Sequence, residues 1–309
     1  MITPGYHLYR GPDHQWRCAG PDDRFFAVGG PDAVLQRVQR LLHSGDDVAR
    51  SSTEQPQVIA ALDLLARRGI VRTSPVAGSS PDPATTGSTD ARSTPPGSAG
   101  RPTVRVSGEN PIADHVRSLL APHASVTGGL LDEAAIAGAD VVVECAGWLP
   151  DARWRSVDAA CVHHATPWHM TYLEGDTVVV GPMHLPGTTA GYADVRGRRL
   201  AAAPSPRELV ALWAYLDGDD PAPPAPWPPP PAAATVAGLV ATDVVHILQG
   251  RPCPSEGHQL VVDPARAEVR RHRVLPLPSF AAVAALEMPD EPASPGAWRV
   301  EEPVDGAAR

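Results

Sequence analysis

The chain has 309 residues, a formal net charge of -9 and a hydrophobic fraction of 43%, which suits two folded domains with real cores. All 26 positively charged side chains are arginine, so Schiff-base and P-loop lysine chemistry are excluded. No apolar run approaches the roughly 20 residues of a membrane span, and the first residues lack a secretory pattern, so we expect a cytoplasmic protein without membrane contact.

Residues 1–73 predict a small winged-helix-like module. Gly-Pro-Asp turns separate three short extended segments, and helices follow them at apolar spacings of three and four residues. The expected strands are Tyr6–Arg10, Gln15–Ala19 and Arg24–Val28. The expected helices are one that carries Val34 to Leu42 and ends at Gly45, a short one at Asp46–Arg50, and one over Pro56–Arg68 behind a capping box at Ser52–Gln55.

Residues 74–101 are rich in Ser, Pro, Gly, Thr and Ala, which is typical of a flexible linker. Residues 102–288 predict a second domain, and residues 289–309 a mobile tail. In the second domain strands and helices alternate, which favours an α/β sheet. The expected strands are Thr103–Val106, Asp140–Cys145, Ala159–Val162, Thr171–Leu173 with Thr177–Val180 as a hairpin, and a final pair at His258–Val262 and Glu268–Val274. One expected helix begins at Pro111, and two more cover Pro206–Leu216 and Ala232–Gln249. A polyproline-type loop is expected between the last two, at residues 221–231.

The segment Val178–Gly191, VVVGPMHLPGTTAG, contains Gly181-Pro182 and Pro186-Gly187. It resembles the central signature of the cyclodehydratase partner proteins of thiazole/oxazole-modified peptide biosynthesis. The strand and helix order before it is similar to a ThiF-like domain, and residues 1–73 resemble a PqqD-like peptide recognition element. The resemblance implies an overall α+β protein: a winged-helix-like recognition element followed by a degenerate ThiF-like α/β domain.

Three departures from that family's pattern limit what the chain inherits. The first zinc-binding cysteine pair would fall at Gly191 and Asp194, and the second near Pro278–Ala282, but neither pair is present. Of the glycine-rich phosphate loop, only Gly108 remains. We therefore expect no cofactor and no structural zinc.

The resemblance implies a non-catalytic partner subunit. Such a protein binds the leader of a ribosomal precursor peptide and presents it to a YcaO-type cyclodehydratase, which forms azoline or azole rings. ThiF-like scaffolds often form homodimers, so a homodimer is possible. Two alternatives stay open: a residual nucleotide-dependent peptide-activating enzyme, and a winged-helix DNA-binding regulator. The balance of nine arginines and eight acidic residues in residues 1–73 disfavours nucleic-acid binding.

A leader peptide can add a strand to the edge of the small sheet beside a helix. The predicted edge is the strand Arg24–Val28, and the predicted helix is Pro56–Arg68. The candidate peptide-binding residues are Arg24, Phe26, Val28, Gln57, Ala61, Leu64 and Arg68.

Two other residue groups suggest chemistry. His163, His164, His169 and His184 lie near one another in sequence, and Asp194 or Cys161 would complete a metal site. Cys145 or Cys161 with a neighbouring histidine would make a nucleophile. We expect neither, because loop histidines and buried cysteines are the more common use of such residues.

Overall fold

The computed structural model describes residues 3, 5–11, 13–44, 56–71, 100–218, 225–277 and 298–299. The predicted helix at residues 46–50, the capping box at 52–55 and most of the linker at 74–101 lie outside these ranges. The proposed domain boundaries therefore stay a prediction. The α/β fold class is confirmed, with a mixed sheet covered by helices on both faces.

The N-terminal module contains a small antiparallel sheet, as predicted. Its strands are β1 (His7–Arg10), β2 (Trp16–Gly20) and β3 (Arg24–Gly29), and a one-turn 3-10 helix, η1 (Pro21–Asp23), connects the last two. Helices α1 (Asp32–Ser44) and α2 (Pro56–Arg67) follow. Leu8, Trp16, Cys18 and Val28 face these helices and form one core with them, because alternate strand residues point to the same face.

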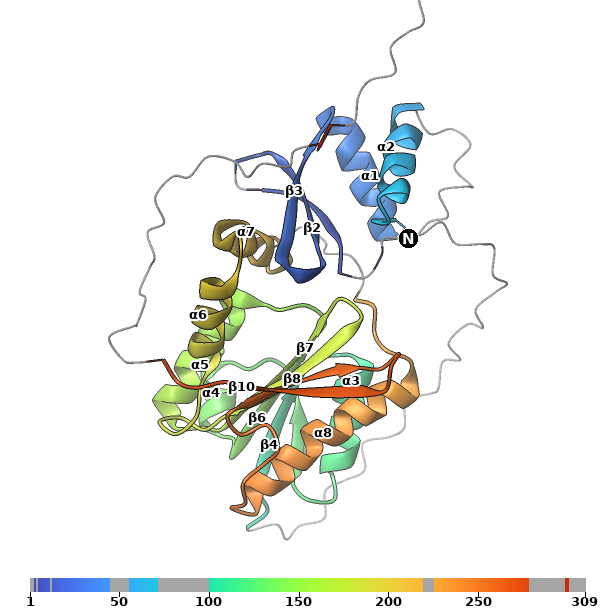
Figure 1. Cartoon of the computed structure of the whole chain (residues 1–309). Helices are drawn as coiled ribbons and strands as arrows, with labels where there is room; N and C mark the ends of the chain where they lie inside the picture. Colours follow the sequence, from blue (N-terminus) through green and yellow to red (C-terminus); the bar gives the residue numbers. More distant parts are fainter. Residues whose placement is uncertain are drawn as a thin grey trace, which may run out of the picture.

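The opposite face of this small sheet packs against the larger domain (Figure 1). Tyr9 stacks on Tyr215 with ring centroids 5.2 Å apart, and both side chains are buried. Arg17 forms an ion pair with Glu208 at 2.9 Å, and Arg199 forms one with Asp23 at 3.0 Å. Helices therefore cover both faces of the sheet.

The larger domain is built on a seven-stranded mixed sheet of order β10-β9-β8-β7-β6-β4-β5. Strands β5, β4, β6 and β7 are parallel, and β7 to β10 are antiparallel. Their bounds are β4 Thr103–Ser107, β5 Ser125–Gly128, β6 Val141–Ala146, β7 Trp168–Glu174, β8 Thr177–His184, β9 His258–Asp263 and β10 Glu268–Arg273. All residues of β6 are buried, which is typical of a central parallel strand.

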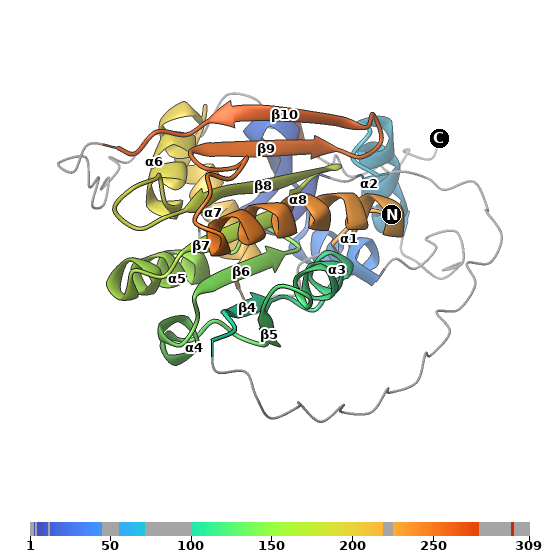
Figure 2. The same cartoon turned by 90° about the horizontal axis from the view of Figure 1, so that it is seen from below.

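Helices divide between the two faces of this sheet (Figure 2). Helices α3 (Pro111–Leu120) and α8 (Pro230–Leu248) pack on one face. Helices α4 (Glu133–Ala137), α5 (Asp151–His164), α6 (Tyr192–Ala202) and α7 (Pro206–Leu216) pack on the other. By length and hydropathy alone α8 meets the criterion for a membrane span, but one side of it is buried against α3 and the sheet.

The sequence misassigned one segment and missed four elements. Residues 159–162, predicted as a strand, lie within α5. That helix buries Trp154, Val157 and Cys161 at helical spacing, and the apolar run near its end resembled a buried strand. The sequence did not indicate β5, α4, the start of α5, or α6. The tail predicted as mobile contributes a two-residue strand, β11 (Trp298–Arg299).

Hydrogen bonds connect α6 to the segment that follows β10. Asp194 Oδ2 accepts from the Gly191 backbone N–H at 2.9 Å, and Asp194 Oδ1 accepts from the Leu277 N–H at 2.7 Å. Arg198 Nε donates to the Leu275 carbonyl at 2.8 Å. A carboxylate and a guanidinium thus fix α6 to the segment after β10. Residues 278–282 lie outside the described part of the chain.

Candidate functional site

The outer edge of β3 carries an additional strand. In the order β1-β2-β3-β11, β3 separates β2 from the two residues of β11. Trp298 pairs with Val28 and Arg299 with Gly29, in parallel orientation. Within the described residues, no strand pairs with this edge at residues 24–27. The edge that the sequence predicted for a peptide therefore accepts an extended segment of the chain itself.

The candidate residues of β3 share one face of the sheet. Phe26 lies opposite Cys18, and Val28 lies opposite Trp16, both of which face α1 and α2. Residues 24, 26 and 28 alternate along the strand, so all three point to this helical side. Arg24 is exposed and Phe26 half-buried, whereas Val28 is buried and lies beside β11.

The candidate residues of α2 follow one stripe along the helix. Gln57, Ala61, Leu64 and Arg68 are spaced by four, three and four residues, which places them on one side. Gln57 and Leu64 are half-buried, and Arg68 is exposed just beyond the last helical residue. Ala61 is fully buried in the module's core. Ala61 therefore belongs to the core and offers no surface to a peptide.

At the place where an α/β sheet of this topology holds a nucleotide, the ends of β4 and β6 lie close together. The chain order reverses between β4 and β6, and ligands of open α/β sheets bind at the carboxyl ends of such strands. Here Gly108 has a φ of 111°, and a Cβ at this position would clash with the Cys145 carbonyl. Asn110 Nδ2 donates to that same carbonyl at 2.9 Å. The segment after β4 therefore approaches the end of β6 closely, and Asn110 bridges the two.

The amino end of α3 is also unsuited to a phosphate. Its first residue, Pro111, has no N–H, and the N–H of Ala113 donates to Asn110 Oδ1 at 3.0 Å. On the neighbouring strand end, a Cβ on Gly147 would lie 2.7 Å from the Ala225 Cβ and 3.2 Å from the Trp227 ring. The proline-rich segment therefore packs directly against the chain that follows β6.

We expect the wild-type chain to show no saturable ATP binding at millimolar concentration, because phosphate sites need free backbone N–H groups at a helix amino end. Isothermal titration calorimetry with ATP and Mg²⁺ checks this. As a control, Asn110→Ala frees the Ala113 N–H without adding a ligand. Saturable ATP heat from the wild type would restore the nucleotide-dependent enzyme as the better hypothesis.

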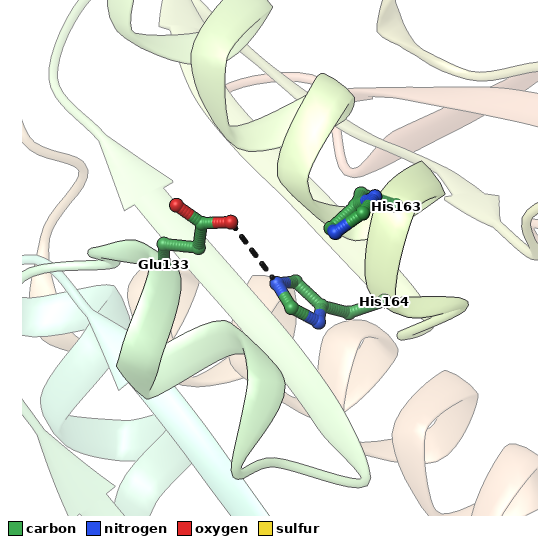
Figure 3. A group of neighbouring side chains, drawn as sticks. All are labelled: Glu133, His163 and His164. Carbon is green, nitrogen blue, oxygen red and sulfur yellow. Dashed lines mark hydrogen bonds and ion pairs between the residues drawn. The ribbon is translucent and has the colours of Figure 1, made fainter.

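The four histidines considered for a metal do not converge. His169, in β7, is fully buried and its Nε2 lies 3.0 Å from Asp243 Oδ2. His184 Nδ1, at the end of β8, lies 3.0 Å from Asp158 Oδ1. His163 and His164, at the end of α5, lie near Glu133 instead (Figure 3). The structure therefore excludes a single site with ligands from all four.

The described cysteines have no nucleophile geometry. Cys145 and Cys161 are buried in hydrophobic cores on opposite faces of the sheet. Burial raises the pKa of each thiol to about 12, and a thiol in its protonated form is a poor nucleophile. Of the suggested additional metal ligands, Asp194 accepts a hydrogen bond from the Leu277 N–H, and Cys161 lies in a hydrophobic core.

No protein-family model matches the chain, and no curated protein matches it. Solved structures are similar to it in part, and three of them are compared below. A heterocyclase in complex with substrate and cofactor has a TM-score of 0.44 at 15% identity, over 89% of this chain and 38% of that one. E. coli MccB with AMPCPP and SeMet MccA has a TM-score of 0.44 at 17% identity, over 58% and 65%. E. coli MccB alone has a TM-score of 0.42 at 17% identity, over 62% and 68%. The chain thus spans 38% of the heterocyclase and 65% of the MccB in the complex, and its function must be argued from its own residues.

Proposed function

We propose that the chain binds the leader of a ribosomally made precursor peptide along β3 and presents the peptide to a YcaO-type cyclodehydratase. The observation that carries the proposal is the pairing of Trp298 and Arg299 with Val28 and Gly29. An edge that accepts a strand from the same chain has free N–H and C=O groups in the geometry that an extended peptide needs. Among the residues that the structure describes, none pairs with the rest of the edge at residues 24–27, so a longer partner could extend along it.

Main-chain pairing supplies affinity, and the side chains beside the edge supply selectivity. On the helical side of β3, Phe26 presents an aromatic ring that is only half-buried. On α2, Leu64 is half-buried. Apolar groups of this kind receive alternate side chains of an added strand. We therefore propose a leader with apolar residues at every second position of its bound segment.

The same residues favour a subunit without chemistry of its own. Among the described residues, Asn110 bridges the ends of β4 and β6, and Trp227 lies close to Gly147 in the segment after β6. The chain contains no lysine, and burial raises the pKa values of the cysteine thiols. Ring closure then belongs to the partner enzyme. The partner, and a homodimer of this chain, remain part of the proposal.

The direct test is fluorescence-polarisation binding of labelled synthetic leader peptides encoded beside this chain's own gene. We expect saturable binding with a micromolar or lower Kd. Leu64→Arg replaces the half-buried apolar side chain of the α2 stripe with a charge and should weaken binding at least about ten-fold, which is about 1.4 kcal/mol. Phe26→Ala should weaken it in the same direction. The measurement is the Kd of each variant at constant salt.

Asp63→Arg is the matched control, because Asp63 precedes Leu64 on α2 but is exposed away from the core. Its Kd should stay within about two-fold of the wild type. If Leu64→Arg and Asp63→Arg bind the leader equally well, the peptide-binding site does not include this face of α2. If no leader binds at all, while a DNA duplex binds with steep salt dependence, the regulator hypothesis replaces this one.

A further inference from the structure

The carboxyl end of α5 and the amino end of α4 bring together three metal-ligating side chains. Glu133, His163 and His164 each offer one ligand atom, and these atoms all lie within 4.8 Å of one another (Figure 3). We propose that these three residues bind a divalent transition-metal ion of the Zn²⁺ class. This site is separate from β3 and does not depend on peptide binding.

The distances suit such an ion. Zn²⁺ holds nitrogen at about 2.0–2.1 Å and oxygen at about 2.0–2.2 Å in a tetrahedron, so two ligand atoms lie about 3.4 Å apart. His164 Nε2 and Glu133 Oε1 are already 3.4 Å apart. His163 is exposed, so its ring can rotate the remaining distance without disturbing the core. Its ring centroid lies 4.7 Å from that of His164.

The backbone that carries the ligands is fixed before any ion binds. Asp132 caps α4, accepting from the Ala135 N–H at 2.8 Å, so Glu133 occupies the first turn of a capped helix. At the end of α5, Ala165 adopts a left-handed conformation that terminates the helix after His164. Thr166 Oγ1 donates to the Ile136 carbonyl at 3.1 Å and connects the chain just after α5 to α4. Binding of the ion therefore costs little conformational entropy, because only side-chain torsions remain to be fixed.

The donor set selects the ion. Two imidazoles and one carboxylate favour Zn²⁺, Co²⁺, Ni²⁺ or Cu²⁺ over Ca²⁺ and Mg²⁺, which prefer oxygen ligands only. Three protein ligands leave a fourth position for water or for a group from another molecule. All four cysteines are buried, so thiolates do not compete for the ion in the folded chain. Without an ion, the same residues make only an exposed histidine–glutamate pair of small stabilising effect.

The test is titration of the full-length, metal-free protein with Zn²⁺ against a chromophoric chelator, with Co²⁺ absorbance as a report on coordination geometry. We expect one equivalent of Zn²⁺ with a micromolar or lower Kd, and tetrahedral d–d bands with Co²⁺. The double variant His163→Gln/His164→Gln should weaken binding by about 100-fold, and Glu133→Gln by about ten-fold. Zn²⁺ at a hundred-fold excess over the wild-type Kd should raise Tm by about 5 to 10 °C in the wild type and by no more than about 2 °C in the double variant.

His123→Gln is the matched control, because His123 is exposed on the same domain and lies outside the cluster. Its Zn²⁺ affinity should equal that of the wild type. Circular dichroism without metal separates loss of ligands from loss of fold, since Glu133 and His163 are exposed and His164 is only half-buried. Equal Zn²⁺ affinity in the wild type and the double variant overturns the proposal, as does a Tm that Zn²⁺ raises equally in both.

Discussion

Replacing Asp243 with alanine is expected to lower the free energy of unfolding by about 3 to 5 kcal/mol, because it leaves a buried polar partner without its acceptor. Asp243, on α8, and His169, on β7, are both fully buried and lie 3.0 Å apart. Asp243 also accepts from the Ser255 N–H at 3.3 Å, and Ser255 Oγ accepts from the Met183 N–H at 3.1 Å. One carboxylate therefore links α8, β7 and the loop before β9. Urea denaturation of both proteins gives the difference.

The conservative variant Asp243→Asn keeps an acceptor of the same shape and should cost less than Asp243→Ala. Val269→Ala, on the exposed strand β10, is the control for losing side-chain atoms without a buried partner. It should change the free energy of unfolding by no more than about 0.5 kcal/mol. A similar small loss in Asp243→Ala would mean that the buried pair contributes little to this fold.

The same carboxylate makes stability depend on acid pH. Burial alone would raise the pKa of Asp243, but its interaction with His169 and its hydrogen bond from Ser255 hold that pKa below the ordinary value of 3.8. The stabilising contribution is therefore complete above about pH 4 and is lost as the pH falls through the lowered value. Asp243→Asn should unfold with a shallower dependence on pH below 4, as urea midpoints measured from pH 2 to 5 would show.

Breaking the strand β11 is expected to tighten leader binding by about ten-fold, or about 1.4 kcal/mol. Within the proposed function, Trp298 and Arg299 occupy part of the edge that the leader needs, and a segment of the same chain competes at a high effective concentration. Trp298→Pro removes a backbone N–H and disfavours the strand, so the edge is freed. Fluorescence polarisation compares its Kd with that of the wild type.

Asp305→Pro introduces the same residue type elsewhere in the C-terminal segment and should leave the Kd unchanged. Deleting residues 278–309 should reproduce the effect of Trp298→Pro. Weaker leader binding in both Trp298→Pro and the deletion would show instead that the C-terminal segment helps to hold the peptide. In either case binding itself is retained, so the result distinguishes competition from the leader-binding role.

Most of the N-terminal module was predictable because its signals are local. Turn tripeptides separate β1, β2 and β3, and the apolar stripes of α1 and α2 repeat at helical spacing. Helix α6 gave no such signal. Its segment YADVRGRRLAA buries only Tyr192 and Val195, so polar contacts hold it more than an apolar face does.

The candidate sites were predictable only in part, because their partners are distant in sequence. His169 was noticed for its neighbours along the chain, but its partner Asp243 lies 74 residues away. Glu133 was not singled out, because it pairs with His164 through the packing of α4 on α5. The self-pairing of β3 with β11 joins residues about 270 positions apart and left no local pattern. Sequence periodicity predicts elements, whereas tertiary packing determines which side chains meet.

The small N-terminal sheet is fixed to the larger domain by the Tyr9–Tyr215 stack and by the ion pairs Arg17–Glu208 and Arg199–Asp23. If a leader adds to β3, its first bound residue has a constant position relative to the seven-stranded sheet. An extended peptide advances about 3.3 Å per residue from that origin. The distance from β3 to a Cys, Ser or Thr would then depend on the number of residues between that side chain and the leader. This number would determine which side chain a docked enzyme reaches.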